Sequence, residues 1–272
     1  MPNTLFVGKV YYRFDELRST NDHAAELVAK SKPPEGTVVR ADSQTAGRGQ
    51  YGSRWESAAG KNLTISVILY PAWLEAQTQF YLSMAVALAL HDTVHECVSR
   101  HHALHDRPPS TVRRLPSTVI KWPNDLYLGD RKAGGILIQN TLSGQFLQSS
   151  IVGIGLNVNQ LEFDPSLPNP TSLGLESGAS FDLEAVCDSL LECLERRYLQ
   201  LKSGHREAIK AEYEGRLYRL GVPARYARAD GTAFSGIIRN VGTDGRLRVE
   251  NETGQEEVFD LKEIRFLSKE AT

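Results

Sequence analysis

Hydrophobic and polar positions along the first 70 residues follow the periods of strands and helices in turn. Residues Leu5 to Phe14 have the composition of a strand, and "STNDHAAELVAK" then begins with side chains that cap a helix. "GTVVRADSQ" predicts a second strand, and Ile65, Val67 and Leu69 alternate on one face of a third, "NLTISVIL". A glycine-rich segment joins the last two strands, so we expect a loop held between two strands.

Two later segments have the periodicity of long helices. Residues Glu75 to Arg100 are apolar through their middle, which predicts a mostly buried helix at the centre of the core. A further helical segment is predicted near Ala208 to Leu217. Between them, another helix is predicted from apolar residues at helical spacing, which are Val186, Leu190, Leu194, Tyr198 and Leu201.

Hairpins are predicted between the helices. "TVIKWPNDLYL" and "RKAGGILIQN" are joined by Gly129-Asp130, a loop of the kind that closes hairpins, and "QFLQSSIVGIGLNVNQ" follows a Ser143-Gly144 turn. Consecutive hairpins predict an α+β fold with a mixed, mostly antiparallel sheet and packed helices. The pattern then changes to short strands and turns, which predicts a small C-terminal β-barrel over residues 219–272 after a larger domain over residues 1–218.

Composition and charge narrow the function. The 272 residues are 41% hydrophobic and 24% charged, which is typical of a soluble globular protein. A net charge of −2 provides no overall basic field, so we expect no DNA partner. No apolar run reaches membrane-spanning length and the first ten residues show no leader, so we expect no membrane partner and a cytoplasmic location.

The cysteines and histidines suggest no metal chemistry. The three cysteines lack metal-binding spacing and are interpreted as packing residues in a reducing compartment. His91 and His95 are four residues apart on a predicted helix, a spacing that can share a metal, and further histidines follow in the Pro/Arg/Ser-rich stretch 101–118. No carboxylate completes a recognisable motif, so no metal-binding residue is predicted. The stretch 101–118 is interpreted as a solvated insertion without an assigned role.

Four polar segments stand out against the apolar strands. They are "STN" at 19–21, "QTAGRGQYGSRW" at 44–55, "KWPNDLYLGDRKAGGILI" at 121–138 and "GIGLNVN" at 153–159. Backbone N–H groups of a glycine-rich loop can approach an anion closely, and Arg48 and Arg54 can add charge-assisted hydrogen bonds. Lys132 follows a tight turn beside Gly134 and Gly135, where a ligand could lie against the backbone. Each segment alone also fits a purely structural interpretation: a helix cap, a mobile surface loop, a hairpin with a solvated lysine on an edge strand, or a strand end.

In this order and spacing, the four segments resemble the motifs of the biotin protein ligases, also called biotin–[acetyl-CoA-carboxylase] ligases or holocarboxylase synthetases. The resemblance runs from about Phe14 to the C-terminus. It implies that biotin carboxylate attacks the α-phosphate of ATP, which gives biotinyl-5′-AMP and pyrophosphate. A lysine of a biotin carboxyl carrier domain then attacks the mixed anhydride. It also implies a catalytic α+β domain followed by a small barrel, and Mg²⁺ that enters with ATP.

The resemblance also implies roles for individual residues. Arg48 and Lys132 are the expected catalytic residues, because the reaction needs positioning and stabilisation of negative charge. The expected biotin-binding residues are Ser19, Thr20, Asn21, Gln44, Arg48, Gly49, Gln50, Lys132 and Gly135. The expected ATP and adenylate contacts are Arg48, Gly49, Gln50, Trp55, Asn124, Lys132 and Asn157. The glycine-rich loop would be a lid that becomes ordered when substrates bind.

The chain departs from parts of that family in two places. Members that double as repressors carry an N-terminal helix-turn-helix domain, whereas "STND" begins here at Ser19, which predicts a monofunctional form. Some relatives read GRGR where this chain reads "GRGQ", so Gln50 stands in place of a cation. We therefore expect this chain to retain the adenylate less tightly.

Two other functions fit parts of the sequence. A lipoate or octanoate ligase shares the implied catalytic fold, but it calls for an apolar channel for the acyl chain and another loop signature. A non-catalytic binding protein would be expected to lack Arg48 or Lys132, and both are present. The oligomeric state and the identity of the acceptor carboxylase leave no signal in the sequence.

Overall fold

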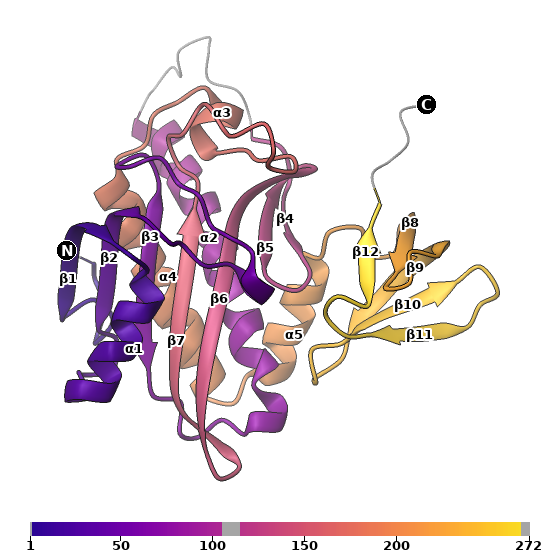
Figure 1. Ribbon diagram of the computed structural model, residues 1–272, viewed down its shortest axis with the longest axis horizontal. Coiled ribbons are helices and arrows are strands. Elements are labelled where there is room, and N and C mark those ends of the chain that lie inside the picture. The colour runs from indigo at the N-terminus through magenta and orange to yellow at the C-terminus, as the bar shows by residue number, and fades with distance from the viewer. Residues whose placement is uncertain (1, 105–114, 268–272) are drawn as a thin grey trace.

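The computed structural model describes residues 2–104 and 115–267 as a large helix-covered sheet with a smaller sheet beside it (Figure 1). Among the described strand pairs of the large sheet, β1 and β2 are parallel and the others are antiparallel. Its spatial order is β1 (Tyr11–Leu17), β2 (Val38–Gln44), β3 (Leu63–Leu69), β7 (Phe146–Leu156), β6 (Arg131–Ser143), β5 (Asp125–Leu128) and β4 (Thr118–Lys121). The predicted mixed, mostly antiparallel α+β layout is therefore confirmed.

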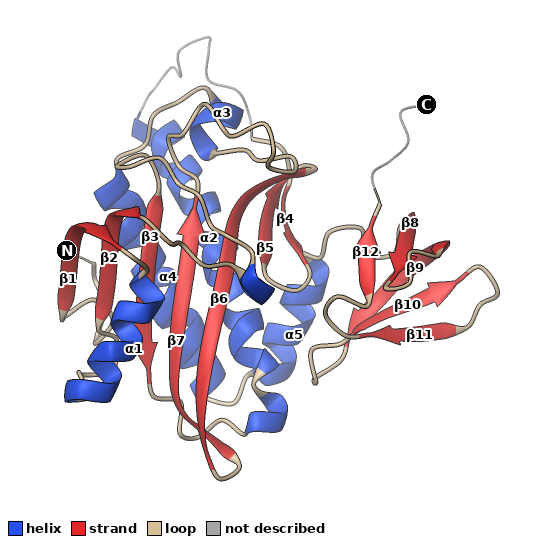
Figure 2. Cartoon of the chain, in the orientation of Figure 1, coloured by secondary structure: helices blue, strands red, loops and turns tan. Residues whose placement is uncertain are grey.

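Helices cover both faces of this sheet (Figure 2). Helix α1 (Thr20–Ser31) packs on one face, over β2, β3 and β7. Helix α2 (Phe80–Leu104) crosses the other face, and α4 (Leu183–Lys202) and α5 (Arg206–Gly215) pack against it. The short helix α3 (Leu173–Ser177) follows the loop that leaves β7.

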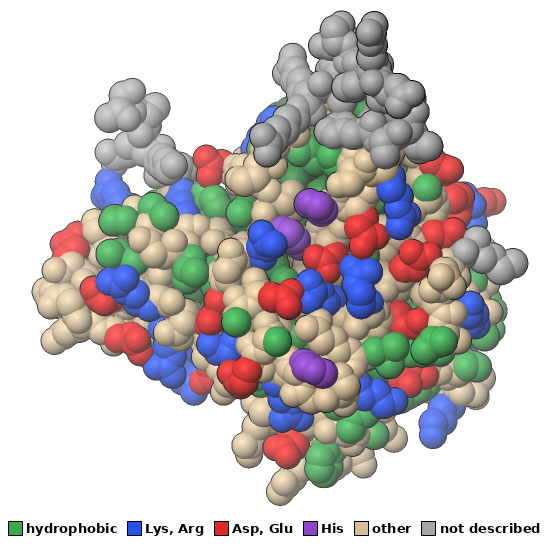
Figure 3. Space-filling view, turned by 180° about the vertical axis from the view of Figure 1, so that it is seen from behind, with side chains coloured by type: hydrophobic (Ala, Val, Ile, Leu, Met, Phe, Trp, Pro, Cys, Tyr) green, Lys and Arg blue, Asp and Glu red, His purple; other side chains and the backbone are tan. Residues whose placement is uncertain are grey.

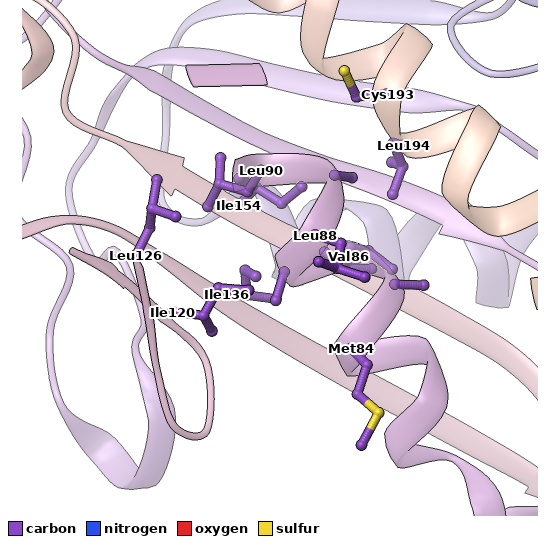
Figure 4. Close-up of a cluster of buried hydrophobic side chains, with 14 of the residues drawn as sticks. Met84, Val86, Leu88, Leu90, Ile120, Leu126, Ile136, Ile154, Cys193 and Leu194 are labelled. Atoms are coloured by element: carbon purple, nitrogen blue, oxygen red, sulfur yellow. The ribbon is translucent and has the colours of Figure 1, made fainter. Parts of the chain in front are cut away.

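The main core lies between α2 and the sheet. Leu88 and Leu90 of α2 belong to the buried cluster that also contains Ile136 of β6 and Ile154 of β7 (Figure 4). Because α2 is apolar on nearly all sides through its middle, it can be covered by the sheet and by α4 at once. The prediction of a buried central helix is confirmed, but a separate 3₁₀ turn at Ala76–Thr78 precedes it, so the helix begins later than Glu75.

The first strand also begins later than its composition suggested. The N–H groups of Leu5, Phe6 and Val7 donate to the buried carboxylate of Glu195 on α4 at 2.6, 2.8 and 2.9 Å. With these donors satisfied by a side chain, the segment needs no strand partner, and β1 begins at Tyr11. A single buried carboxylate therefore holds the start of the chain on α4.

The face of the molecule that lies behind the view of Figure 1 carries both acidic and basic side chains, and these are interspersed rather than grouped by charge (Figure 3). Several of these side chains form ion pairs between helices, as Arg197 of α4 does with Asp92 of α2 at 2.8 Å.

The three cysteines, in α2 and α4, are buried and form no disulfide, and burial raises the pKa of Cys97 and of Cys193 to about 11. In the described parts of the chain, no helix combines the length and apolar character needed to cross a membrane.

The C-terminal strands form an antiparallel sheet. Its order is β11 (Glu256–Phe259), β10 (Leu247–Asn251), β9 (Ala233–Val241), β8 (Pro223–Arg228) and β12 (Ile264–Phe266). Within residues 115–267, the edge strands β11 and β12 do not pair with each other, so strand pairing does not close the expected barrel. The indole Nε1 of Trp122 donates to the carbonyl of Gly245 at 2.9 Å, which ties this sheet to the turn before β5.

The predicted insertion at 101–118 falls partly outside the described residues. Helix α2 continues to Leu104 and β4 begins at Thr118. The domain boundary near residue 218 stays a prediction. The chain at that point pairs with β4, because the N–H of Tyr218 donates to the carbonyl of Ile120 at 2.9 Å.

Candidate active site

A cavity of about 190 Å³ lies between the glycine-rich loop and the face of the large sheet. It brings together segments that are far apart in the sequence: the start of α1, the glycine-rich loop, the turn before β5, the start of β6, and β7. All the predicted site residues except Asn157 line it: Ser19, Thr20, Asn21, Gln44, Arg48, Gly49, Gln50, Trp55, Asn124, Lys132 and Gly135.

The glycine-rich loop folds into a small hairpin over this pocket. The N–H of Gly49 donates to the carbonyl of Ser53 at 2.7 Å, and the N–H of Trp55 donates to that of Gly47 at 3.1 Å. A β-carbon at Gly47 would lie 2.3 Å from the carbonyl oxygen of Trp55, and one at Gly49 would lie 2.3 Å from Oγ of Ser53. Gly47 is therefore required because it packs against backbone, whereas a side chain at Gly49 would first have to displace the Ser53 hydroxyl.

The two ends of this loop are fixed to the sheet. On the entering side, the N–H of Ala46 donates to the carbonyl of Arg18 at 2.9 Å. On the leaving side, the N–H of Gly60 donates to the carbonyl of Asp42 at 3.0 Å, and buried Asn62 accepts from the N–H of Val158 at 2.9 Å. Sequence reasoning missed Asn62, although an amide side chain directly before an apolar strand was a signal available in "KNLTISVIL".

One wall of the pocket is polar and uncharged. Ser19 caps α1, and the N–H of Thr20 donates to Oε1 of Gln44 at 2.7 Å. Ser66 of β3 supports this wall. Its fully buried hydroxyl lies 2.8 Å from Oγ1 of Thr20 and donates to Oδ1 of Asn21 at 2.6 Å. Sequence reasoning missed Ser66, whose signal was a hydroxyl in the middle of an otherwise apolar strand.

Two glycines of β7 make room for this wall and for an indole ring. A β-carbon at Gly153 would lie 2.2 Å from Oδ1 of Asn21, and one at Gly155 would lie 2.4 Å from Cε2 of Trp55. The Trp55 ring thus rests directly on the strand backbone. Its Nε1 is buried and has no hydrogen-bond partner among the described residues. A buried N–H donor at a pocket is a ready position for a ligand acceptor.

Three cations line the pocket, Arg48, Arg54 and Lys132, and the first and last of these each lie beside a carboxylate. Nη1 of Arg48 lies 2.6 Å from Oδ1 of Asp22, and Nζ of Lys132 lies 2.7 Å from Oδ1 of Asp125. The backbone of Lys132 is held by the segment 169–171, since its N–H donates to the carbonyl of Asn169 and its carbonyl accepts from the N–H of Thr171, both at 2.8 Å. Such a cation is pre-positioned for an anion in the pocket.

Comparison with known proteins places this fold and pocket in a family. A sequence model of the biotin/lipoate A/B protein ligase family matches residues 13–157, which is more than half of the chain. The chain belongs to the biotin/lipoate A/B protein ligase family. The pocket residues Ser19 to Gly155 all fall within the matched part.

Relatives in this ligase family align along most of the chain. A bifunctional ligase/repressor from Bacillus subtilis is 31% identical over 94% of this chain and 74% of its own length. A biotin–[acetyl-CoA-carboxylase] ligase from Mycobacterium tuberculosis is 29% identical over 88% of this chain and 84% of its own length. The fold is similar to that of a biotin protein ligase from Aquifex aeolicus solved with biotin and ATP, with a TM-score of 0.71, 23% identity, and coverage of 95% of this chain and 100% of that one.

The two asparagines expected on the ATP side of this ligase-family pocket differ in position. Asn124 lines the pocket, and its Nδ2 donates to the carbonyl of Ile136 at 2.5 Å, which fixes the turn before β5 against β6. Asn157 is buried outside the lining, and its Nδ2 donates to the carbonyl of Thr171 at 2.9 Å. The structure therefore does not bring Asn157 together with the other predicted site residues, and its contact with ATP stays a prediction.

The pocket lining offers few side chains that could bind a metal ion. Among its lining residues, Asp125 is the one acidic side chain, and no group of three or more metal-binding side chains occurs in the described ranges. This donor set fits a Mg²⁺ ion carried on the phosphates of ATP, which keeps several waters and needs few protein ligands.

Proposed function

We propose that the protein is an ATP-dependent biotin protein ligase of the biotin–[acetyl-CoA-carboxylase] type. It activates biotin as biotinyl-5′-AMP with release of pyrophosphate, and then transfers biotin to a lysine of a biotin carboxyl carrier domain. The single observation that carries this proposal is the meeting, in one pocket, of an uncharged polar wall with the cations Arg48 and Lys132. The family match and the names of relatives aligned over most of the chain support it.

The polar wall suits the ureido ring of biotin. That ring is neutral but needs both donors and acceptors, which Ser19, Thr20 and Gln44 provide without a charge that would have to be desolvated. Asn21 supports the wall through Ser66 and through its own Nδ2, which donates to Oε1 of Gln139 at 3.0 Å. Gly135 leaves the neighbouring backbone of β6 open to the ligand.

The cations account for the chemistry of the first step. When the biotin carboxylate attacks the α-phosphate, negative charge builds on the phosphate oxygens and pyrophosphate leaves. Arg48 and Lys132 stabilise that charge from two sides, with backbone donors such as Gly49 and the side chain of Gln50 nearby. No nucleophile from the protein is needed, so the rate depends on alignment and on electrostatic preorganisation.

The adenosine part of ATP belongs on the Trp55 side of the pocket. The flat indole offers a stacking surface and a buried N–H donor, and Asn124 lies on the adjoining turn. Mg²⁺ would arrive with the phosphates, and Asp125, the one acidic side chain of the lining, would be the protein carboxylate that could hold it. When bound, the ion neutralises phosphate charge and helps pyrophosphate to leave.

In the second step, the amine of the carrier lysine attacks the carbonyl carbon of the mixed anhydride and AMP leaves. The new bond is an amide, and the amine loses a proton in the process. Arg48 and Lys132 stabilise the charge on the departing phosphate, as they do in the first step. We place this reaction in the cytoplasm, where ATP is supplied and where unpaired cysteines such as those of this chain persist.

A lipoate ligase is the competing function within the same family, and substrate preference separates the two. The test measures pyrophosphate release by the purified protein with ATP and either biotin or lipoate, followed by mass increase of a biotin carboxyl carrier domain. We expect release only with biotin and a carrier heavier by one biotinyl group. Release with lipoate alone would overturn the proposal in favour of the lipoate ligase.

A further inference from the structure

Asp22 lies in the first turn of α1, one residue beyond the polar wall, and its side chain pairs with Arg48 of the pocket lining. The 2.6 Å distance joins Oδ1 of Asp22 to Nη1 of Arg48, so the contact links α1 directly to the glycine-rich hairpin. Asp22 itself does not line the pocket, and no role was expected for it from the sequence.

Asp22 contacts Nη1 of Arg48, and this determines which edge of the guanidinium stays available for a substrate anion. A guanidinium has five N–H donors, and its Nε–Nη2 edge binds a carboxylate or phosphate with two parallel hydrogen bonds. Asp22 engages Nη1 and leaves that edge uncommitted, since no described residue accepts from Nε or Nη2 of Arg48. The carboxylate thus fixes one corner of the guanidinium without occupying the edge that suits an oxyanion.

We propose that Asp22 is a positioning residue for the adenylation step. It holds Arg48 by Nη1 so that the Nε–Nη2 edge is presented to the biotin carboxylate and the α-phosphate. The proposal rests on the proposed function and deepens it, because it assigns the orientation of the arginine to a residue outside the pocket. An arginine on a glycine-rich loop otherwise loses much side-chain freedom when it binds, and a fixed corner lowers that loss.

A purely structural role for Asp22 makes a different prediction. An acidic residue in the first turn of a helix also interacts favourably with the helix N-terminus. In that case its loss would affect α1 and the whole polar wall, and every ligand that contacts the wall would bind less well. A positioning role affects only ligands that present an anion to Arg48.

The test compares biotin with biotinamide, a neutral analogue that keeps the ureido ring and lacks the carboxylate. For Asp22→Ala, we expect biotin affinity to fall several-fold and single-turnover pyrophosphate release to slow about tenfold, with biotinamide affinity unchanged. Asp22→Asn keeps an oxygen that accepts from Nη1, so it should recover most of the loss. Glu26→Ala is the matched control, because Glu26 is an exposed carboxylate of the same helix that pairs with Lys30 instead.

A double-mutant cycle decides whether Asp22 acts through Arg48. In an Arg48→Ala background, Asp22→Ala should weaken biotin binding no further. Equal losses for biotin and biotinamide, a full additional loss in the Arg48→Ala background, or wild-type behaviour of Asp22→Ala would each overturn the assignment. Failure of the wild-type protein to release pyrophosphate with biotin would instead overturn the proposed function, and the role of Asp22 with it.

Discussion

Nζ of Lys132 lies 2.7 Å from Oδ1 of Asp125, and both side chains line the same pocket. The carboxylate of Asp125, on the neighbouring strand β5, therefore orients the Lys132 ammonium group in the pocket. Its backbone is held on the other side by Asn169 and Thr171. A lysine restrained in this way can stabilise developing charge with little reorganisation.

Lys132→Ala is expected to slow adenylate formation by about 10²-fold or more, because loss of one preorganised charge partner costs about 3 kcal/mol in the transition state. Single-turnover pyrophosphate release measures this effect. Lys30→Ala removes an exposed lysine of α1 and should leave the rate unchanged. A near-normal rate for Lys132→Ala in a folded protein would remove Lys132 from the mechanism.

Gln50 lies in the 3₁₀ turn at the tip of the glycine-rich hairpin and lines the pocket. Gln50→Arg should slow the escape of biotinyl-5′-AMP several-fold, because charge-assisted hydrogen bonds are roughly twice as strong as neutral ones. Dissociation of labelled adenylate in the absence of carrier domain measures the difference. Gln50→Lys tests whether charge alone is sufficient. Equal off-rates for wild type and Gln50→Arg would mean that another group, such as Arg54, already closes the loop.

Gly155→Ala is expected to displace the indole of Trp55, since the added β-carbon would lie 2.4 Å from its Cε2. Overpacking of this kind costs about 1–3 kcal/mol, so the KM for ATP should rise about tenfold while biotin affinity changes less. Tryptophan fluorescence reports the ring movement directly. Gly215→Ala, where an added β-carbon meets nothing within 4 Å, is the control. An unchanged KM for ATP would argue against Trp55 on the adenosine side.

The contribution of the Asp92 carboxylate to the free energy of unfolding should depend on pH. Burial favours its neutral form, but the His91 ring, with Nδ1 3.6 Å from Oδ1, and the hydrogen bond from Arg197 outweigh burial and lower its pKa to about 2. A carboxyl with a depressed folded pKa stabilises the fold above its unfolded pKa, and this contribution is lost as the pH falls through the folded value. Wild type should exceed Asp92→Asn by about 2 kcal/mol in free energy of unfolding from pH 5 to 7.

Urea denaturation of both proteins measures that difference. It should shrink between pH 4 and pH 2, the window between the unfolded and folded pKa of an aspartate of this kind. Asp15→Asn removes an exposed carboxylate from β1 and serves as the control for a change in net charge. A difference between wild type and Asp92→Asn that does not change with pH would show that Asp92 acts through packing alone.

Long periodic segments were predictable from the sequence because their periodicity reflects burial. The hairpin of β6 and β7 lies where its pattern placed it, and α2 does so apart from its later start at Phe80. The start of β1 was not predictable in this way, because the carboxylate of Glu195, almost 190 residues away, satisfies the donors of Leu5 to Val7. A local pattern carries no signal for a partner that distant.

The residues that line the pocket were easier to predict from the sequence than the residues that hold them in place. Ordered motifs pointed to Arg48, Lys132 and the polar wall, and the structure brings them together. Ser66 and Asp22 were missed because their roles arise from tertiary contacts with those residues, and Asn62 was missed because its partner, Val158, lies far along the chain. Asn157 shows the converse, since a motif can include a residue that fixes neighbouring backbone without lining the pocket.

The anchoring of the glycine-rich loop at both ends affects how strongly a substrate can bind. Fixing one residue of a mobile chain costs about 1–2 kcal/mol of entropy, so a long free lid would consume much of the interaction energy of a small ligand. Here Ala46 and Gly60 are tied to the sheet, and the hairpin between Gly47 and Trp55 carries its own hydrogen bonds. Few backbone torsions of this hairpin remain to be frozen when a substrate binds, so most of the contact energy can appear as affinity.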